Sequence, residues 1–279
     1  MNREPEVWRR TYLEDGFVVV PDLLDAATLE VLRAALEKIV GDVEAVPAHL
    51  KGKLFFERQH VKNNTRYYAG SVSPEDCGDA VRQIEDLALF DAAFASLIRH
   101  EPTLDVLEAL FDGAEFSLTY LNGRPKAARV GNGVSDGHFH RDTPFEEFTS
   151  VNTILAVTCL DPMTDDNGPI EFIRGSHKVS DEEAKQPRWR DVASGEFEDS
   201  PDRVVVNCAA GSGVFFNTKT LHAAGHNRSE RTRHTIFSEW VGPGVLPTSP
   251  ERHAFEGLRP RSKEPLFRKQ LEMAFREAL

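Results

Sequence analysis

The pattern of hydrophobic and polar positions changes period near Gly113, and this change divides the chain into two parts. Before it the spacing is mainly helical. A helix is expected to begin after Asp25, which can cap it, and its apolar stripe comprises Leu29, Leu32, Leu36, Ile39 and Val40. Further helical patterns cover residues 86–90, 97–99 and 103–110, and the glycine at 113 can end the last of them. The β-branched run of residues 17–20 predicts a strand.

After this point the spacing becomes that of β-strands. Every second side chain from residue 116 onward belongs to one set, which is Phe116, Leu118, Tyr120 and Asn122. Strand-like runs then cover residues 150–160, 168–173, 203–207, 213–216 and 233–241. Helices first and short, antiparallel-looking strands later predict an α+β fold whose core is a rolled β-sandwich. No internal repeat or low-complexity linker divides the chain, so we expect one domain.

Composition is that of a globular protein. Of the 279 residues, 40% are hydrophobic and 28% are charged. No apolar run approaches the roughly 20 residues that a membrane-spanning helix needs, and residues 1–6 lack the apolar core of a signal peptide. We therefore expect a cytoplasmic protein that has no membrane partner. Whether it is a monomer or a homodimer is left open by the sequence.

Charge and cysteine content exclude two further classes. The formal net charge is -12 and the basic residues are dispersed, so nucleic acid is not an expected partner. The three cysteines, Cys77, Cys159 and Cys208, are odd in number and widely spaced. Neither a disulfide framework nor a thiolate zinc site is indicated, and we expect the thiols to be reduced.

The clearest chemistry lies in residues 137–144, where His140 and Asp142 stand two positions apart in a segment that has the pattern of a strand end. Side chains at i and i+2 of an extended chain point the same way, so these two can reach one ion. A distant histidine completes the two-His-one-carboxylate site of non-haem iron(II). His222 is the best candidate for it. His138 has the parity of His140 and is the alternative ligand, although no carboxylate follows it two residues later.

Four short motifs in a fixed order resemble those of the phytanoyl-CoA dioxygenase-like family. They are His140-Arg141-Asp142, Asp166-Asn167-Gly168-Pro169-Ile170, Gly175-Ser176-His177, and His222 followed by Asn227, Ser229 and Arg233. The strand at residues 16–19 and the helix after it also resemble the family, so the resemblance covers most of residues 12–241. Any one motif is weak. The four in order favour a metal site over unrelated polar residues.

The resemblance implies a double-stranded β-helix, a jelly-roll or cupin-like barrel, within one Fe(II)/2-oxoglutarate dioxygenase domain. Its parts are then a helix-rich region over residues 1–112, a β-helix core over about 113–245, and a C-terminal extension over 246–279 that includes a helix. The implied cofactors are iron(II), 2-oxoglutarate as co-substrate, and dioxygen. The implied metal ligands, which form the catalytic centre, are His140, Asp142 and His222.

In the resembling family an arginine at the offset of Arg233 holds 2-oxoglutarate. Arginine suits the far carboxylate because its planar fork pairs with both oxygens. Thr235, one alternation further on, is a candidate for a second hydrogen bond, and Arg231 is the alternative anion clamp because it has the same parity. Further candidate co-substrate contacts are Asn122, Tyr120 and Asn152. The histidines expected to be structural are His177, His226 and His234.

Residues 54–70 mix aromatic and cationic side chains, which suggests a loop that forms one wall of a substrate pocket. An ordinary half-buried strand with exposed charges is the alternative interpretation. The candidate substrate contacts are His138, Arg58, His60, Lys62 and Arg66. Together with 18 phenylalanines, they indicate a small organic acid or a hydrophobic metabolite of secondary metabolism.

The expected reaction is hydroxylation of an unactivated C–H bond, with decarboxylation of 2-oxoglutarate to succinate and CO2. Desaturation or epoxidation requires only a different placement of the substrate. Two other hypotheses remain. One is a cupin-like dioxygenase or isomerase that binds metal through His138, His140 and His222 and does not use 2-oxoglutarate; the other is a noncatalytic β-sandwich binding module.

Overall fold

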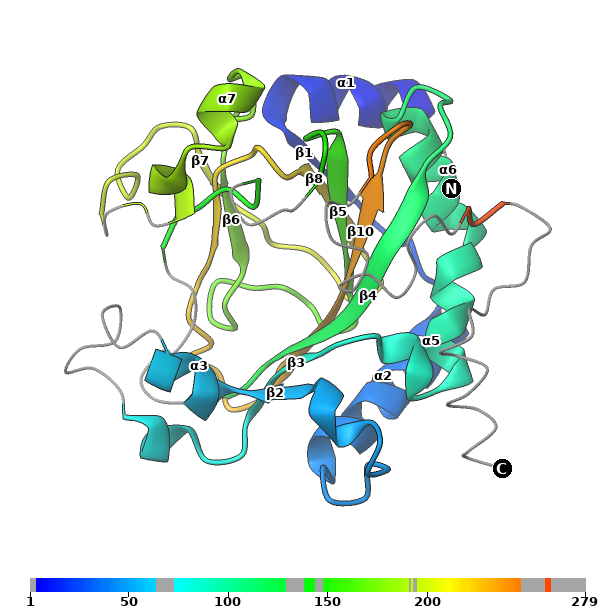
Figure 1. Ribbon diagram of the computed structural model, residues 1–279, viewed down its shortest axis with the longest axis vertical. Helices are drawn as coiled ribbons and strands as arrows, with labels where there is room; N and C mark the ends of the chain where they lie inside the picture. The colour runs from blue at the N-terminus through cyan, green and yellow to red at the C-terminus, as the bar shows by residue number, and fades with distance from the viewer. Residues whose placement is uncertain are drawn as a thin grey trace.

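The computed structural model describes residues 4–63, 73–128, 138–143, 148–190, 192, 195–246 and 259–261. Two antiparallel sheets form its core, with helices packed on the outside of the larger one (Figure 1). The strands are β1 (Phe17–Val20), β2 (Leu54–Phe56), β3 (Val81–Ile84), β4 (Ser117–Lys126), β5 (Thr153–Cys159), β6 (Ile170–Ile173), β7 (Arg203–Val205), β8 (Gly213–Asn217), β9 (His222–Ala224) and β10 (Arg233–Val241). The α-helices are α1 (Pro5–Asp15), α2 (Ala26–Gly41), α3 (Glu57–Asn63), α5 (Ala92–Ser96), α6 (Glu101–Leu110) and α7 (Asp181–Ala184). The 3-10 helices are η1 (Lys51–Lys53), η2 (Pro74–Cys77), η3 (Leu87–Leu89), η4 (Leu97–Arg99) and η6 (Pro187–Arg190).

The larger sheet has seven strands in the order β1-β8-β5-β10-β4-β3-β2, and the smaller sheet has three in the order β7-β6-β9. His140 forms an isolated antiparallel bridge with His222 of β9, which itself pairs with β6. The segment that carries the first candidate metal ligand therefore extends the smaller sheet. This is the α+β double-stranded β-helix that the sequence predicted. Among the described residues, no helix combines the length and the apolar character needed to cross a membrane.

Two hydrophobic clusters lie on opposite faces of the larger sheet. On the outer face, Ile236 of β10 packs in one cluster with Leu36 of α2 and Leu104 of α6. On the inner face, Phe17 of β1 stacks on Phe172 of β6, with ring centroids 4.3 Å apart. This stack joins the two sheets. Helices α2 and α6 therefore cover the outer face, and the candidate ligand His222 belongs to the smaller sheet on the inner side.

Local sequence explains the elements that were predicted best. The Asp25 carboxylate accepts a hydrogen bond from the Thr28 amide at 2.8 Å and so caps α2, whose buried residues are Leu32, Leu36 and Ile39. β10 covers the same residues, 233–241, that alternation predicted. Long amphipathic or alternating segments carry their own structural signal.

The N-terminal region contributes more to the barrel than its sequence indicated. β2 and β3 extend the larger sheet beyond β4, so the sheet is not confined to residues from about 113 onward. Residues 54–63 form a short strand and a helix rather than a loop, and α1 was also not expected. These strands have only three or four residues, which is too short for alternation to show. The predicted C-terminal helix lies outside the described residues.

Gly16 joins α1 to β1 with a φ of 91°. A Cβ here would lie 2.6 Å from both His177 Nδ1 and Thr220 Oγ1. We expect Gly16→Ala to lower the free energy of unfolding by about 2 kcal/mol or more, because the left-handed backbone and the overlap both oppose a side chain. Gly41→Ala is the matched control, since nothing lies within 4 Å of its added Cβ. Chemical denaturation measures both, and equal stability of the two variants would contradict this expectation.

Candidate metal and co-substrate site

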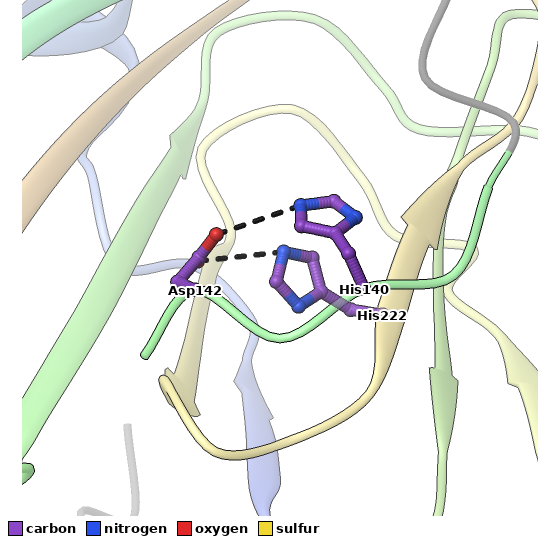
Figure 2. A group of neighbouring side chains, drawn as sticks. All are labelled: His140, Asp142 and His222. Carbon is purple, nitrogen blue, oxygen red and sulfur yellow. Dashed lines mark ion pairs between the residues drawn. The ribbon is translucent and has the colours of Figure 1, made fainter. Parts of the chain in front are cut away.

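His140, Asp142 and His222 converge on one point (Figure 2). The Nε2 atom of His140 lies 3.5 Å from Oδ1 of Asp142, and Nε2 of His222 lies 3.5 Å from Oδ2. These separations are close to those of neighbouring ligands around one ion with bonds of about 2.1 Å. In the part of the chain that the structure describes, this is the one cluster of His, Cys, Asp or Glu donors suited to a metal ion.

Backbone hydrogen bonds fix the three residues relative to one another. The His140 amide donates to the His222 carbonyl at 2.9 Å, and the His222 amide donates to the His140 carbonyl at 3.0 Å. The Asp142 amide donates to the Thr218 carbonyl at 3.1 Å, in the turn between β8 and β9. Both ligand segments are therefore registered on the smaller sheet, which explains how residues far apart in sequence meet.

The two imidazoles are oriented for metal binding through Nε2. Nδ1 of His140 lies 3.1 Å from the His138 carbonyl oxygen, and Nδ1 of His222 lies 3.0 Å from the Thr220 carbonyl oxygen. A carbonyl only accepts, so each Nδ1 carries a proton, and Nε2 is the ring nitrogen that faces Asp142. A metal ion that takes the place of the proton on Nε2 would bind the two rings in this orientation.

Asp142 supplies the negative charge of the site. Burial raises the pKa of this carboxyl, but the charge of His222 together with the hydrogen bond and charge of His140 outweighs it, so the pKa lies below its ordinary value. The Asp142 and His140 side chains each remain 23% exposed, so small molecules can reach them. One carboxylate and two imidazoles fit iron(II) and leave coordination positions open for other ligands.

Arg141 stands between two ligands in sequence but makes its contacts on the opposite side of the segment. Its guanidinium donates to the carbonyl oxygens of Ser176, at 2.7 Å, and of Lys219, and its Cζ lies 4.5 Å from the centre of the Trp189 ring. Burial lowers the pKa of this guanidinium to about 10, so it stays charged at neutral pH. The contacts of Arg141 tie the ligand segment to the loops that precede α7 and β9. Alternation along the segment predicts that the Arg141 side chain points away from the metal ligands. It does not predict which residues Arg141 contacts.

Arg233 is the first residue of β10 and is only 4% exposed. Its Nε and Nη1 atoms are buried without a hydrogen-bond partner among the described residues. Burial lowers the pKa of this guanidinium, against the opposing effects of Cys159 and Asp161. Buried cationic donors without partners are costly, so their presence fits an anion bound from outside the chain. Arg231, the alternative clamp, is exposed.

Two other candidate co-substrate contacts lie on the face of Arg233 but already have partners. The Thr235 hydroxyl donates to the Arg124 carbonyl at 2.9 Å, so its hydrogen is not available to a carboxylate while that bond lasts. The Asn122 side-chain oxygen accepts from the Asp86 amide at 3.1 Å, which leaves its NH2 group for a ligand. Their roles with 2-oxoglutarate stay predictions.

Arg124 is a site residue that sequence reasoning missed. It continues the alternation of Tyr120 and Asn122 along β4, opposite β10. Its guanidinium lies 5.7 Å from the centre of the Phe237 ring, and its charge contributes to the low pKa of the Asp142 carboxyl. The same alternation, followed for one more position, would have found it.

The structure separates Asn152 from Arg233. The Asn152 carbonyl accepts from the Gly242 amide at 2.9 Å, just beyond the last residue of β10. Arg233 begins that strand, and its nine residues span about 26 Å at strand rise. Asn152 is also exposed. One molecule the size of 2-oxoglutarate cannot contact both, so Asn152 is not a co-substrate contact if Arg233 is.

The proposed cationic wall is mostly a surface feature. Arg58 lies in α3, pairs with Asp79 at 2.7 Å, and keeps half of its side chain exposed. Lys62 is exposed on the same helix, and His60 is half-buried. Arg66 lies outside the described residues. Residues 57–63 are helical, so they form neither the predicted pocket loop nor the alternative half-buried strand.

Three other histidines have contacts outside the donor cluster, and the role predicted for His226 stays a prediction. His138 is not part of the donor cluster, and its carbonyl instead orients His140. His234 pairs through Nδ1 with the Asp161 carboxylate at 2.8 Å, and Nε2 of His177 lies 3.2 Å from the Leu13 carbonyl oxygen. Both of the latter contacts are structural.

The sequence profile described as phytanoyl-CoA dioxygenase (PhyH) matches residues 12–235 of this chain. The chain belongs to this family. The matched range includes all three residues of the donor cluster as well as Arg233.

Curated relatives are distant but similar over most of the chain. Dioxygenase olcK of Penicillium canescens is 21% identical over 79% of this chain, and the match covers 65% of the fungal protein. L-proline trans-4-hydroxylase of Streptomyces griseoviridis is 24% identical, over 71% of this chain and 81% of the relative. The Fe(II)/2-oxoglutarate-dependent dioxygenase nvfF of Aspergillus novofumigatus is 23% identical, over 87% and 73% of the two chains.

Solved structures share the fold. The epimerase SnoN, in complex with Fe3+, alpha ketoglutarate and nogalamycin RO, superposes with a TM-score of 0.64 at 20% identity, over 95% of this chain and 93% of the other. EctD from S. alaskensis with bound Fe gives 0.66 at 18% identity, over 95% and 87%.

These findings confirm the predicted family, the double-stranded β-helix, and an enzyme of the Fe(II)/2-oxoglutarate-dependent oxygenase class. The hypothesis of a noncatalytic binding module is wrong. The roles of individual residues beyond the donor cluster stay predictions.

Proposed function

We propose that this protein hydroxylates an unactivated C–H bond of a small-molecule metabolite and converts 2-oxoglutarate to succinate and CO2 in the same reaction. The observation that carries the proposal is the combination of a two-His-one-carboxylate donor cluster with the buried Arg233, whose Nε and Nη1 have no hydrogen-bond partner in the described part of the chain. We also propose that the enzyme is cytoplasmic and acts as a monomer or a homodimer.

His140, Asp142 and His222 would hold iron(II), which supplies the oxidising chemistry once 2-oxoglutarate and dioxygen are bound. Arg233 binds the far carboxylate of 2-oxoglutarate through two parallel hydrogen bonds and so fixes its orientation. The ring of Phe216 lies 4.8 Å from that of His222, and this apolar contact limits access of water to one side of the site. The protein thus contributes orientation and exclusion of water.

The inner face suggests a substrate that has both an acidic and an apolar part. Arg124 offers a second cation on this face, next to the half-buried ring of Phe237. A small organic acid with a hydrophobic portion matches this pair better than it matches the exposed Arg58 and Lys62 of α3. The relative named L-proline trans-4-hydroxylase acts, by its name, on L-proline, which is a small organic acid.

Other outcomes at the same site are desaturation and epoxidation, and a cupin-like reaction without 2-oxoglutarate is the alternative. That alternative assigned a ligand role to His138, which lies outside the donor cluster. It also provides no anion for the Nε and Nη1 atoms of Arg233, which have no hydrogen-bond partner among the described residues.

Anaerobic titration with iron(II) and then 2-oxoglutarate tests the proposal. A metal-to-ligand charge-transfer band should appear only when both are present, because it requires the keto acid to chelate the metal. Glutarate, which lacks the keto group, is the control and should give no band. A substrate screen scored by succinate release then follows. Iron binding without any response to 2-oxoglutarate would favour the cupin-like alternative.

A further inference from the structure

Cys159 and Cys208 bring their sulfur atoms together on the inner side of the barrel. The two Sγ atoms are 3.7 Å apart, although the residues lie in different segments. Cys159 ends β5 and is fully buried. Cys208 lies in the loop between β7 and β8, where its backbone exchanges two hydrogen bonds with Met163, of 2.9 and 3.0 Å. Both side chains are therefore held in register by the fold.

The two thiols differ in reactivity. A hydrogen bond with Cys159 lowers the pKa of Cys208 to about 7, helped by the Met163 amide and the positive charge of Arg233, while burial opposes this. The same hydrogen bond and burial raise the pKa of Cys159. Cys208 is only half-buried, so a small oxidant can reach it. The pair thus has an accessible thiolate and a neighbouring thiol positioned to react next.

We propose that Cys159 and Cys208 form a redox modification site that closes to a disulfide when hydrogen peroxide reaches Cys208. The Cys208 thiolate attacks one oxygen of the peroxide; an S–O bond forms, the O–O bond breaks, and hydroxide leaves and takes up a proton as water. Cys159 loses its proton and attacks the sulfenic sulfur; the S–S bond forms and the S–O bond breaks, releasing a second water. Two thiols lose two electrons, and one peroxide gains them.

The two sulfur atoms need to move only a short distance for this reaction. A disulfide bond is about 2 Å long, so the two sulfur atoms must approach by less than about 2 Å. In a reducing compartment such a pair rests as thiols, and a disulfide formed there is transient. Cys77 is the third cysteine, and its pKa is raised by burial and by Glu57, so it is the less reactive thiol.

The charge of Arg233 also affects the pKa of both thiols. Cys159 is the cross-strand partner of Thr235, two residues after Arg233, and the charge of Arg233 stabilises both thiolates. This step rests on the proposed function: a carboxylate bound to Arg233 cancels that charge and raises the pKa of Cys208. A higher pKa lowers the fraction of Cys208 that is thiolate at pH 7. Bound 2-oxoglutarate should therefore slow oxidation of Cys208.

The test treats the purified full chain, without iron, with one equivalent of hydrogen peroxide per chain. We expect free thiols to fall from three to one per chain, with loss of two hydrogen atoms by intact mass and a Cys159–Cys208 cross-link in the peptide map. Cys77→Ser should still form the disulfide, whereas Cys208→Ser should not. In Cys159→Ser the sulfenic acid at Cys208 should persist and be captured by dimedone.

Three intact thiols, oxygen addition without a cross-link, or a cross-link through Cys77 in the wild-type chain would overturn the proposal, and none of these readings depends on a variant folding. The 2-oxoglutarate experiment separates the two hypotheses when Arg233→Gln is run beside the wild type, because free 2-oxoglutarate itself consumes peroxide. Protection that is equal in the wild type and in Arg233→Gln supports the redox site and counts against co-substrate binding at Arg233. Protection that is larger in the wild type than in Arg233→Gln supports both.

Discussion

His222→Ala is expected to abolish both iron binding and succinate formation. The variant removes one of the two nitrogen ligands, and with it the ring that lies 3.5 Å from the Asp142 carboxylate. Loss of an outer-shell partner of a metal ligand typically costs about 10–100-fold in affinity or activity, so loss of a ligand itself should exceed that range. Anaerobic iron titration measures the binding, and release of succinate measures the turnover.

His226→Ala is the matched control for this variant. His226 follows in the next turn of the chain and is not part of the donor cluster. Iron affinity and succinate formation should stay within a few-fold of the wild type. If His222→Ala turns over like the wild type, or if both variants lose iron equally, the metal site is assigned to the wrong residues.

The extent to which sequence predicts this molecule depends on how local each signal is. The strand β10 and the same-side placement of His140 and Asp142 follow from alternation over a few residues, and the structure confirms both. The choice of His222 as the distant partner came from the order of motifs. Alternation cannot supply it, because the pairing of the histidines depends on backbone hydrogen bonds between separate segments.

Two features could not be predicted without the strand register of the whole sheet. Asn152 has a suitable polar side chain, but the sequence does not show that it lies beside Gly242, at the end of β10 opposite Arg233. The contact between Cys159 and Cys208 depends on a bridge from Cys208 to Met163 in another loop. Such neighbours are set by tertiary packing, and parity along one strand does not identify them.

Arg233→Gln is expected to raise the KM for 2-oxoglutarate by about 100-fold or more while iron binding is retained. Removal of one partner from a buried ion pair costs about 3 kcal/mol or more, which corresponds to that factor. Arg233→Lys should have an intermediate effect, since it keeps the charge but loses the fork that contacts both oxygens. Succinate formation as a function of 2-oxoglutarate concentration measures these values.

The matched control is Arg231→Gln, because Arg231 has the same parity on the chain but is exposed. Its KM for 2-oxoglutarate should stay near that of the wild type. The reverse result, with Arg231→Gln impaired and Arg233→Gln normal, would move the anion clamp to Arg231.

Thermal stability without ligands distinguishes a binding role of Arg233 from a structural one. In the described structure its Nε and Nη1 lack hydrogen-bond partners, so the ligand-free protein bears the cost of burying a charge that it does not satisfy. Arg233→Gln should therefore leave the Tm of the ligand-free protein unchanged or raise it. The increase in Tm that 2-oxoglutarate gives the wild type should disappear in the variant. A large drop in the Tm of the ligand-free variant would instead show that Arg233 stabilises the barrel itself, because a residue held only for an external carboxylate contributes nothing to folding in its absence.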